Sequence, residues 1–166
     1  MNSLEATSRK VVDTALCKGV TLATAESLTA GMISATLAEI PGASGTLLGG
    51  IVSYDARIKQ ELLLVPQSVI DGVGVISELC ARQMAAGAKA VLKADIAVSA
   101  TGLAGPGGGT AETPVGTVFL GICASDGETR VFRKHFSGNR ETVRKKTTLA
   151  ALEMILQELQ TLPDRE

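Results

Sequence analysis

The residues TAESLTAG at positions 24–31 mark the point where a strand passes into a helix. A short run of β-branched and apolar residues, 20–25, precedes this point, and apolar spacing typical of a helix continues over 28–40 until a Pro-Gly pair at 41–42. Such a turn places a hydroxyl beside free backbone N–H groups at the positive end of a helix dipole, where an oxyanion or phosphate oxygen is stabilised. Ser27 is therefore a candidate nucleophile, although a serine here also fits an ordinary helix N-cap.

Helices and strands alternate on both sides of this turn. Apolar spacing and capping residues predict further helices over 4–18, 55–63, 77–93 and 139–160. Apolar and β-branched runs predict strands over 20–25, 47–54 and 95–101, followed by a hairpin of 115–124 and 129–136. The alternation predicts a single three-layer α/β/α domain over residues 1–166, with a mixed, mainly parallel sheet of five or six strands.

Composition limits the classes of protein to which this chain can belong. Its 166 residues are 45% hydrophobic and 20% charged, which suits one globular domain with a sizeable core. Aromatic residues make up 2% and Trp is absent, so stacking platforms for single-stranded nucleic acid are not expected. The net charge of −1 likewise argues against a polyanionic partner such as nucleic acid.

The N-terminus and the cysteines both favour the cytoplasm. The first residues, MNSLEA, lack the apolar core of a signal peptide, and no apolar run reaches the roughly 20 residues of a membrane span. Cys17, Cys80 and Cys123 are far apart and lack CxxC spacing, which favours reduced thiols over disulfides or a zinc site. We expect a soluble cytoplasmic protein without a bound metal and without membrane contact.

A second group of chemical interest is SYDARIK at 53–59, which contains the only Tyr of the chain. It follows a predicted strand and enters a short helix, so Tyr54 and Lys59 can reach the same edge of the sheet, where α/β proteins place their sites. A serine nucleophile needs a base. The single His135 lies beside basic residues and suits a solvated edge, whereas a Ser-Lys pair needs no histidine. That pair requires Lys59 to be partly desolvated, and an ordinary surface lysine is the alternative.

A third group is the glycine-rich stretch GLAGPGGGT at 102–110, which follows a predicted strand. Its glycines allow the backbone to approach a ligand closely and to turn N–H groups toward an anion. The stretch lacks the Gly-Lys-Ser/Thr ending of a Walker loop and the GxGxxG dinucleotide pattern. It is either a binding loop or a mobile connection.

A fourth group, FSGNRETVR at 136–144, opens the last predicted helix. Arg140 and Arg144 lie four residues apart on one face of its first turns, where the helix dipole disfavours cations by up to about 1 kcal/mol. A bound phosphate would compensate both arginines. Glu141 and solvent screening offer a structural alternative.

Five motifs occur in a fixed order along the chain: ESLTAG at 26–31, GGIVSY at 49–54 with Lys59, GLAGPGG at 102–108, PVGTV at 114–118 and FSGNR at 136–140. With this combination the chain closely resembles the CinA C-terminal domain family, the nicotinamide-nucleotide amidases, over residues 4–159. The resemblance implies hydrolysis of the carboxamide of nicotinamide mononucleotide to nicotinic acid mononucleotide and ammonia. It also suggests a homodimer or a larger homo-oligomer. The reaction that we expect requires no metal, and we expect no cofactor.

The resemblance further implies a Ser-Lys site assisted by a tyrosine, which corresponds to Ser27, Lys59 and Tyr54. We therefore expect Lys59 to activate Ser27, with Tyr54 relaying or orienting the proton, so that an acyl-enzyme forms. Backbone N–H groups at the start of the following helix, together with the loop 102–105, would hold the oxyanion. We expect substrate contacts from Glu26, Thr29, Gly31, Thr101, Gly102, Ala104, Gly105, Arg140 and Arg144.

Two residues depart from the family pattern, because Ala30 stands where Gly is usual and Thr113 stands where Lys is common. Larger members carry an additional N-terminal nucleotide-hydrolysing domain, for which this chain is too short. Two other functions remain open at this point: a nucleotide-binding module without catalysis, and a serine amidase for another small carboxamide. Loss of Arg140 would spare the activity of such an amidase if its substrate carried no phosphate.

Overall fold

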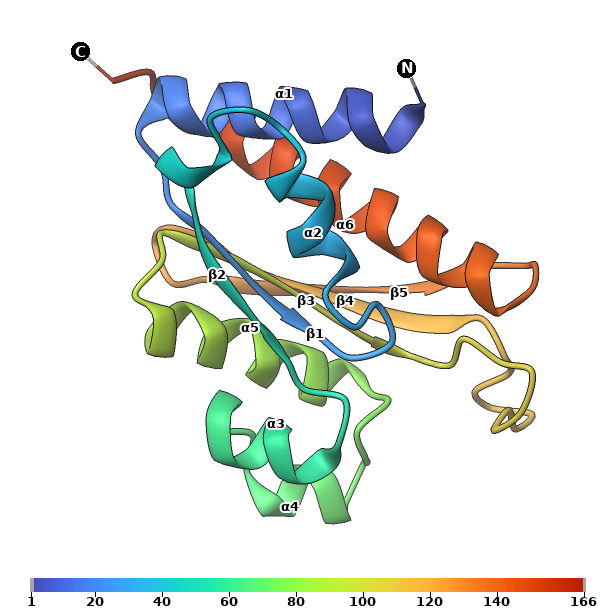
Figure 1. Cartoon of the computed structure of the whole chain (residues 1–166). Coiled ribbons are helices and arrows are strands. Elements are labelled where there is room, and N and C mark those ends of the chain that lie inside the picture. Colours follow the sequence, from blue (N-terminus) through green and yellow to red (C-terminus); the bar gives the residue numbers. More distant parts are fainter. Residues whose placement is uncertain (1, 166) are drawn as a thin grey trace.

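A computed structural model describes residues 2–165, and its strands form one mixed sheet (Figure 1). The strands stand in the order β2-β1-β3-β4-β5. Their bounds are β1 Leu22–Glu26, β2 Leu47–Val52, β3 Ile96–Gly102, β4 Thr117–Cys123 and β5 Thr129–His135. β1 pairs in parallel with β2 and β3, whereas β3–β4 and β4–β5 are antiparallel. The predicted mixed sheet is confirmed, with its parallel part confined to three strands.

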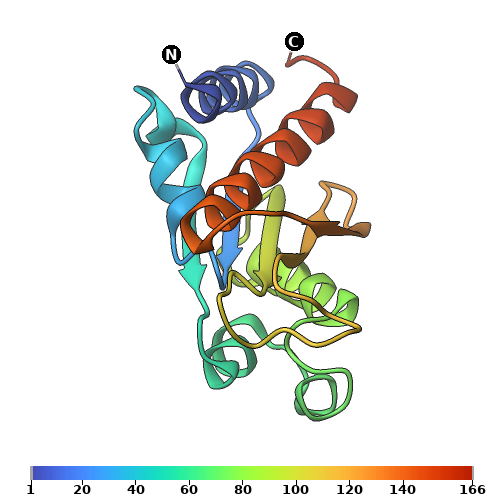
Figure 2. The same ribbon diagram turned by 90° about the vertical axis from the view of Figure 1, so that its right-hand side faces the viewer.

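Helices cover both faces of the sheet and complete three layers. Their bounds are α1 Ser3–Lys18, α2 Met32–Ala38, α3 Ala56–Leu63, α4 Gln67–Asp71, α5 Glu78–Leu92 and α6 Arg140–Thr161, with a 3₁₀ turn at Ala43–Gly45. Figures 1 and 2 show α1, α2 and α6 on one face and α3, α4 and α5 on the other. The predicted α/β/α domain is thus confirmed. The α4 turn is an addition that no sequence pattern indicated.

The two cores follow from the alternation of side chains along the strands. Leu22 of β1 and Val98 of β3 belong to the cluster that contains residues of α1, α2 and α6, whereas Ala23 and Ala25 belong to the cluster formed with α3, α4 and α5. Successive strand residues point to opposite faces, so β1 is buried on both sides. The residue that follows Glu26 is therefore directed toward the α3–α5 layer.

Three predicted helix starts are confirmed by their caps. The side chains of Asp55, Ser77 and Asn139 accept hydrogen bonds from backbone N–H groups two or three residues later. Such caps each contribute about 1 kcal/mol. Because a cap depends on neighbouring residues alone, these boundaries could be predicted from the sequence.

One boundary is corrected. The helix after β1 begins at Met32, not at residue 28, so Ser27 is not its N-cap. Residues 28–31 instead form a tight turn in which Ala30 and Gly31 have φ values of 48° and 97°. Backbone in this left-handed region favours glycine, so Ala30 adopts a conformation that a side chain disfavours by about 1–2 kcal/mol.

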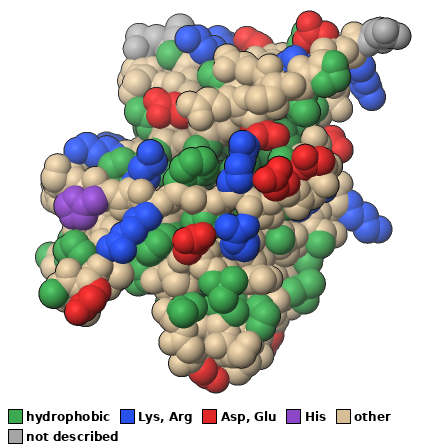
Figure 3. Space-filling model, turned by 180° about the vertical axis from the view of Figure 1, so that it is seen from behind, with side chains coloured by type: hydrophobic (Ala, Val, Ile, Leu, Met, Phe, Trp, Pro, Cys, Tyr) green, Lys and Arg blue, Asp and Glu red, His purple; other side chains and the backbone are tan. Residues whose placement is uncertain are grey.

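The outer strand β5 carries charged side chains along an open edge of the sheet. Arg133 and Lys134 are exposed, and so is His135, as expected for a solvated edge. Charged groups protect an edge strand from pairing with other chains. Figure 3, in which the single histidine is purple, shows Lys and Arg interspersed with acidic and hydrophobic groups on this side. Within residues 2–165, no helix has the length and apolar character needed to cross a bilayer.

Candidate active site

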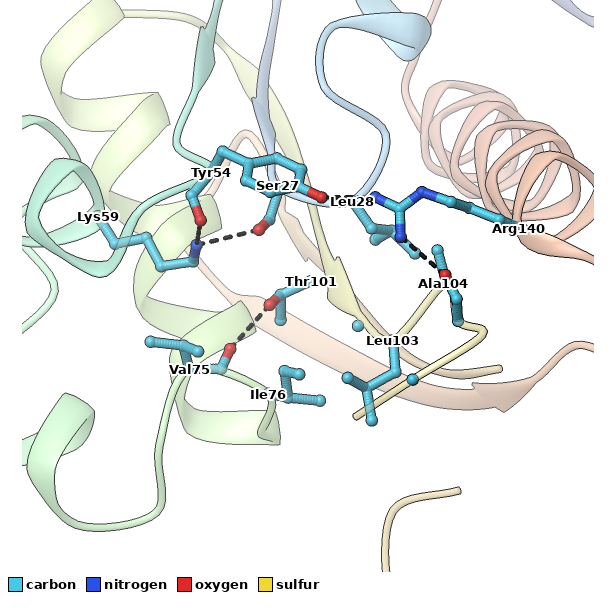
Figure 4. Close-up of a pocket in the computed structure, with 13 residues that line it drawn as sticks. Ser27, Leu28, Tyr54, Lys59, Val75, Ile76, Thr101, Leu103, Ala104 and Arg140 are labelled. Carbon is cyan, nitrogen blue, oxygen red and sulfur yellow. Dashed lines mark hydrogen bonds between the residues drawn. The ribbon is translucent and has the colours of Figure 1, made fainter. Parts of the chain in front are cut away.

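A cavity of about 200 Å³ opens at the carboxyl ends of the parallel strands (Figure 4). Open α/β sheets place ligands at this edge because the loops after the strands converge there. The lining residues come from the loops after β1 and β2, from α3, from the segment before α5, from the end of β3 and the loop after it, and from the start of α6: Ser27, Leu28, Tyr54, Lys59, Val75, Ile76, Thr101, Gly102, Leu103, Ala104, Gly105, Gly107 and Arg140. No carboxylate stands among these described residues.

The two residues predicted to react are in contact. The Lys59 amine lies 3.0 Å from the Ser27 hydroxyl oxygen, within hydrogen-bond distance. Ser27 extends from the end of β1 toward the α3–α5 layer, and Lys59 comes from α3, which Asp55 caps. The two side chains therefore meet because Ser27 points to this face of β1 and because α3 begins at the cap residue Asp55.

Lys59 is only 1% exposed, which is unusual for a lysine. Burial lowers the pKa of its amine, and the more distant Asp55 and Cys80 oppose that shift only in part. Burial also raises the pKa of the Cys80 thiol to about 11, so its thiolate opposes the Lys59 shift only at high pH, and near pH 7 the neutral thiol supplies no counter-charge. Within residues 2–165, no carboxylate lies within salt-bridge distance of the Lys59 amine.

The remaining contacts of Lys59 suit a neutral amine. Its nitrogen donates hydrogen bonds to the backbone carbonyls of Ser53 and Tyr54, the latter at 3.3 Å. A carbonyl oxygen can only accept, so these two partners match the two N–H groups of a neutral amine. The lone pair is then available to the Ser27 hydroxyl, which is the arrangement of a general base and its nucleophile.

Glu26 lies on the opposite side of the strand and does not line the cavity. It is 1% exposed, and its carboxylate accepts from the N–H groups of Ile33 and Ser34 at 2.8 and 3.0 Å. The hydroxyls of Ser34 and Thr24 donate to the same group. Glu26 therefore anchors α2 to β1, and the expectation that it contacts substrate is corrected. The same bonds occupy N–H groups in the first turn of α2, which we expected to hold an oxyanion.

Arg140 lies at the cavity mouth and is held by two neutral oxygens. Its guanidinium donates to the carbonyl of Gly105 at 2.8 Å and to the hydroxyl of Tyr54 at 2.7 Å. Figure 4 shows this contact with Tyr54 on the side of the ring away from Lys59. The Tyr54 hydroxyl is hydrogen-bonded to neither Ser27 nor Lys59, so the expected proton relay through Tyr54 is absent from this arrangement.

Arg144 does not face the cavity, because its guanidinium is hydrogen-bonded to the backbone of the turn after Ser27. Its guanidinium donates to the carbonyls of Leu28 and Thr29 at 2.8 and 3.3 Å. Arg144 was expected to contact a phosphate, and this expectation is corrected: its donors hold the nucleophile turn. The adjacent Thr29 and Gly31 also lie outside the cavity lining. The buried Thr29 hydroxyl has no hydrogen-bond partner within residues 2–165.

The end of β3 and the loop after it supply one wall of the cavity. Thr101, Gly102, Ala104 and Gly105 all line it. The Thr101 hydroxyl donates to the carbonyl of Val75 at 2.8 Å and so ties the segment before α5 to β3. Thr113, the other departure from the family pattern, bonds to Thr110 in the outer part of this loop and is not in the lining.

An apolar part of the cavity escaped sequence analysis. Leu28 and Leu103 lie on one side, and Val75 and Ile76 come from the segment before α5. Apolar residues next to loops resemble ordinary core residues, so no local signal marked them. Within residues 2–165, no cluster of three His, Cys, Asp or Glu side chains is arranged to hold a metal ion.

The sequence of this chain matches a known protein family. The model of the CinA C-terminal domain matches residues 4–159. This chain belongs to the CinA C-terminal domain family. The resemblance stated from the sequence motifs is thereby confirmed.

Relatives in the CinA family are similar over most of this chain. A CinA-like protein of Mycobacterium marinum is 45% identical over 134 residues, which cover 81% of this chain and 32% of the relative. A CinA-like protein of Thermotoga neapolitana is 41% identical over 139 residues, covering 84% and 34%. The chain thus spans about a third of the length of these curated relatives.

Solved CinA structures have the same fold. The competence/damage inducible protein CihA from Agrobacterium tumefaciens aligns with a TM-score of 0.93 and 35% identity, over 96% of this chain and 97% of that chain. The competence damage-inducible protein A (ComA) from Klebsiella pneumoniae aligns with a TM-score of 0.93 and 31% identity, over 98% and 100%. These names state no reaction.

Proposed function

We propose that this chain hydrolyses the carboxamide of nicotinamide mononucleotide, giving nicotinic acid mononucleotide and ammonia. The contact between Ser27 and Lys59 carries the proposal, because a buried lysine without a carboxylate partner beside a serine hydroxyl is suited to nucleophilic catalysis. The guanidinium of Arg140 at the cavity mouth, which is hydrogen-bonded only to neutral oxygens among the described residues, supports a phosphorylated substrate.

The shape of the cavity is consistent with this substrate. Its volume of about 200 Å³ is smaller than the roughly 300–1,000 Å³ typical of small-molecule sites, so it suits one ring with its carboxamide. Ribose and phosphate would then lie toward Arg140. The apolar groups of Leu28 and Ile76 suit the faces of the ring. The pyridinium ring carries a fixed positive charge, which favours the neutral form of the nearby Lys59 amine.

Acylation begins when the Ser27 oxygen attacks the carboxamide carbon and the Lys59 nitrogen accepts the hydroxyl proton. The resulting tetrahedral intermediate collapses as the C–N bond breaks. Lys59 returns the proton to the leaving NH₂ group, which departs as ammonia. An ester between Ser27 and the nicotinoyl group remains.

Deacylation reverses the roles. Lys59 accepts a proton from water, the hydroxide attacks the ester carbon, and the C–O bond to Ser27 breaks. The proton returns to the Ser27 oxygen, and the carboxylic acid leaves as its carboxylate with release of one proton to solvent. Lys59 is thus base and acid in turn.

Two backbone N–H groups in the cavity wall supply the oxyanion donors in this proposal. The N–H groups of Leu28 and Ala104 donate to no described residue, and both residues line the cavity. An N–H directly after a nucleophilic serine is a common oxyanion donor. Loss of one such donor costs about 3–4 kcal/mol of transition-state stabilisation.

Ammonia release from nicotinamide mononucleotide tests the proposal directly. Wild-type protein should release ammonia, and Ser27→Ala should be slower by at least about 10³-fold, since the nucleophile is gone. Serine at position 44, on the exposed turn before β2, offers a matched control as Ser44→Ala. Binding of the nucleotide without ammonia release would favour the non-catalytic module, and equal turnover by Arg140→Ala would favour an amidase for unphosphorylated carboxamides.

A further inference from the structure

Tyr54 touches two parts of the cavity with two different groups. Its backbone carbonyl accepts from the Lys59 amine at 3.3 Å, and its side-chain hydroxyl accepts from the Arg140 guanidinium at 2.7 Å. The first contact would survive any substitution, because every residue has a backbone carbonyl. The phenol hydroxyl, the only group specific to tyrosine, is therefore directed to Arg140 and away from the reacting pair (Figure 4).

The guanidinium that Tyr54 holds carries an uncompensated charge. Arg140 makes no salt bridge within residues 2–165, and the carboxylate of its neighbour Glu141 is paired with Lys145. Two of the five N–H donors of Arg140 are used by Gly105 and Tyr54, both through neutral oxygens. Three donors and a full positive charge remain for an anion at the mouth of the cavity.

We infer that the Tyr54 hydroxyl is a positioning group for Arg140, which makes Tyr54 a determinant of affinity for the phosphate monoester of the substrate instead of a proton carrier. The inference rests on the proposed function, because it assigns the phosphorylated end of that substrate to Arg140. A long arginine side chain that is ordered before binding loses less conformational freedom on meeting its ligand.

Removing the hydroxyl leaves Arg140 with one tether, the carbonyl of Gly105. Tyr54 is 56% exposed, so Tyr54→Phe keeps the ring and creates no cavity in the core. We expect KM for nicotinamide mononucleotide to rise about 3- to 10-fold, because binding must then order one long side chain that the hydroxyl no longer holds. The value of kcat should change less than about twofold. For the riboside, which lacks the phosphate, neither constant should change by more than about twofold.

A proton carrier would give a different pattern. Tyr54→Phe would then lower kcat for both substrates and would alter the pH profile of kcat. That result would overturn the inference. In the background of Arg140→Ala, the additional change Tyr54→Phe should have no further effect on KM, because the group to be positioned is missing.

Binding of ribose 5-phosphate, measured by calorimetry, separates this inference from the proposed reaction. Ribose 5-phosphate should bind wild-type protein about 3- to 10-fold more tightly than it binds Tyr54→Phe, whether or not ammonia is released. Equal affinities, or no binding to wild type, would overturn the role of Tyr54. Absence of ammonia release together with the expected difference in affinity would instead reject the amidase and retain the anion site.

Discussion

The Lys59 amine and the Ser27 hydroxyl are 3.0 Å apart, although the two residues are separated by 32 positions in the chain. The lysine approaches from α3 and the serine from the end of β1, so neither helix nor strand alone contains the pair. Each is buried, and the lysine has only neutral oxygens around it.

The amidase activity should increase with pH through the pKa of Lys59. Only the neutral amine can accept the Ser27 proton, and burial lowers this pKa below its usual 10.5. We expect log(kcat/KM) to increase with pH with a slope near one and to become constant above the pKa of Lys59, which lies below 10.5. Lys59→Arg, which cannot deprotonate near neutral pH, should abolish turnover across the range. A flat profile for wild type, measured by ammonia release, would exclude Lys59 as the base.

The stability of the fold should depend on the same group without any substrate. Because burial lowers the Lys59 pKa, the unfolded chain binds more protons between that pKa and 10.5, so stability increases with pH in this window. Cys80, whose pKa is raised from 9.0, acts in the opposite direction only above pH 9. Between the Lys59 pKa and 10.5, urea unfolding should therefore show a steeper gain for wild type than for Lys59→Met, by at most about 1.4 kcal/mol per pH unit. Parallel curves would contradict a lysine buried in its neutral form.

Glu26→Gln should destabilise the fold by about 1–3 kcal/mol. The substitution replaces one acceptor oxygen by an NH₂ group that faces the N–H groups of Ile33 and Ser34, so at least one donor is left unpaired. The midpoint of urea denaturation measures the effect. Glu153→Gln, at an exposed position of α6, is the matched control and should change stability by less than about 0.5 kcal/mol. A stable Glu26→Gln variant with weakened substrate binding would restore Glu26 to the list of substrate contacts.

Arg144→Lys should lower kcat about 10-fold or more and leave KM within about twofold. A lysine cannot reproduce the two contacts with the carbonyls of Leu28 and Thr29, so the turn that carries Ser27 loses its alignment, and small misplacements of reacting groups are costly. Steady-state kinetics with nicotinamide mononucleotide provide the measurement. Arg9→Lys, on the surface of α1, serves as the control. A rise in KM alone would mean that Arg144 binds phosphate after all.

Gly87→Ala should be destabilising and inactivating, although alanine is the better helix former. A Cβ at this position of α5 would lie 1.8 Å from the carbonyl oxygen of Leu63, at the end of the helix that carries Lys59. Helix α3 would have to move away from α5, and Lys59 would move with it. Gly49→Ala, where a Cβ meets no atom within 4 Å, is the control. Unaltered melting and turnover of Gly87→Ala would show that α3 is not held by this close approach.

The features that could be predicted from the sequence are those that depend on neighbours in the chain. Asp55 and Ser77 were recognised as helix caps because a cap and its partner lie within three residues. The alternation of helices with strands likewise led to the three layers, and the strand ends led to the edge where Ser27 and Lys59 meet. Local signals thus suffice to define the framework of the site.

The features that sequence analysis missed depend on contacts between distant segments. Tyr54 and Arg140 are 86 positions apart, and their bond requires the start of α6 to reach the end of β2. The spacing of four residues places Arg144 on the same helix face as Arg140, which favours a phosphate ligand. In the structure, however, its guanidinium donates to the carbonyl of Leu28 in the turn after β1. The start of α2 was placed too early because apolar spacing continues through residues 28–31, whereas the chain there makes a tight turn.

Glu26 and Ser27 are consecutive, and β1 sends them to opposite faces of the sheet. If β1 slipped by one residue against its neighbours, the Glu26 carboxylate would take the place of the Ser27 hydroxyl beside the Lys59 amine, and Ser27 would turn to the opposite face of the sheet. Such a molecule would hold an ion pair in place of a nucleophile. A molecule with β1 out of register would therefore be inactive. A population that contained such molecules would have fewer active sites but the same substrate specificity.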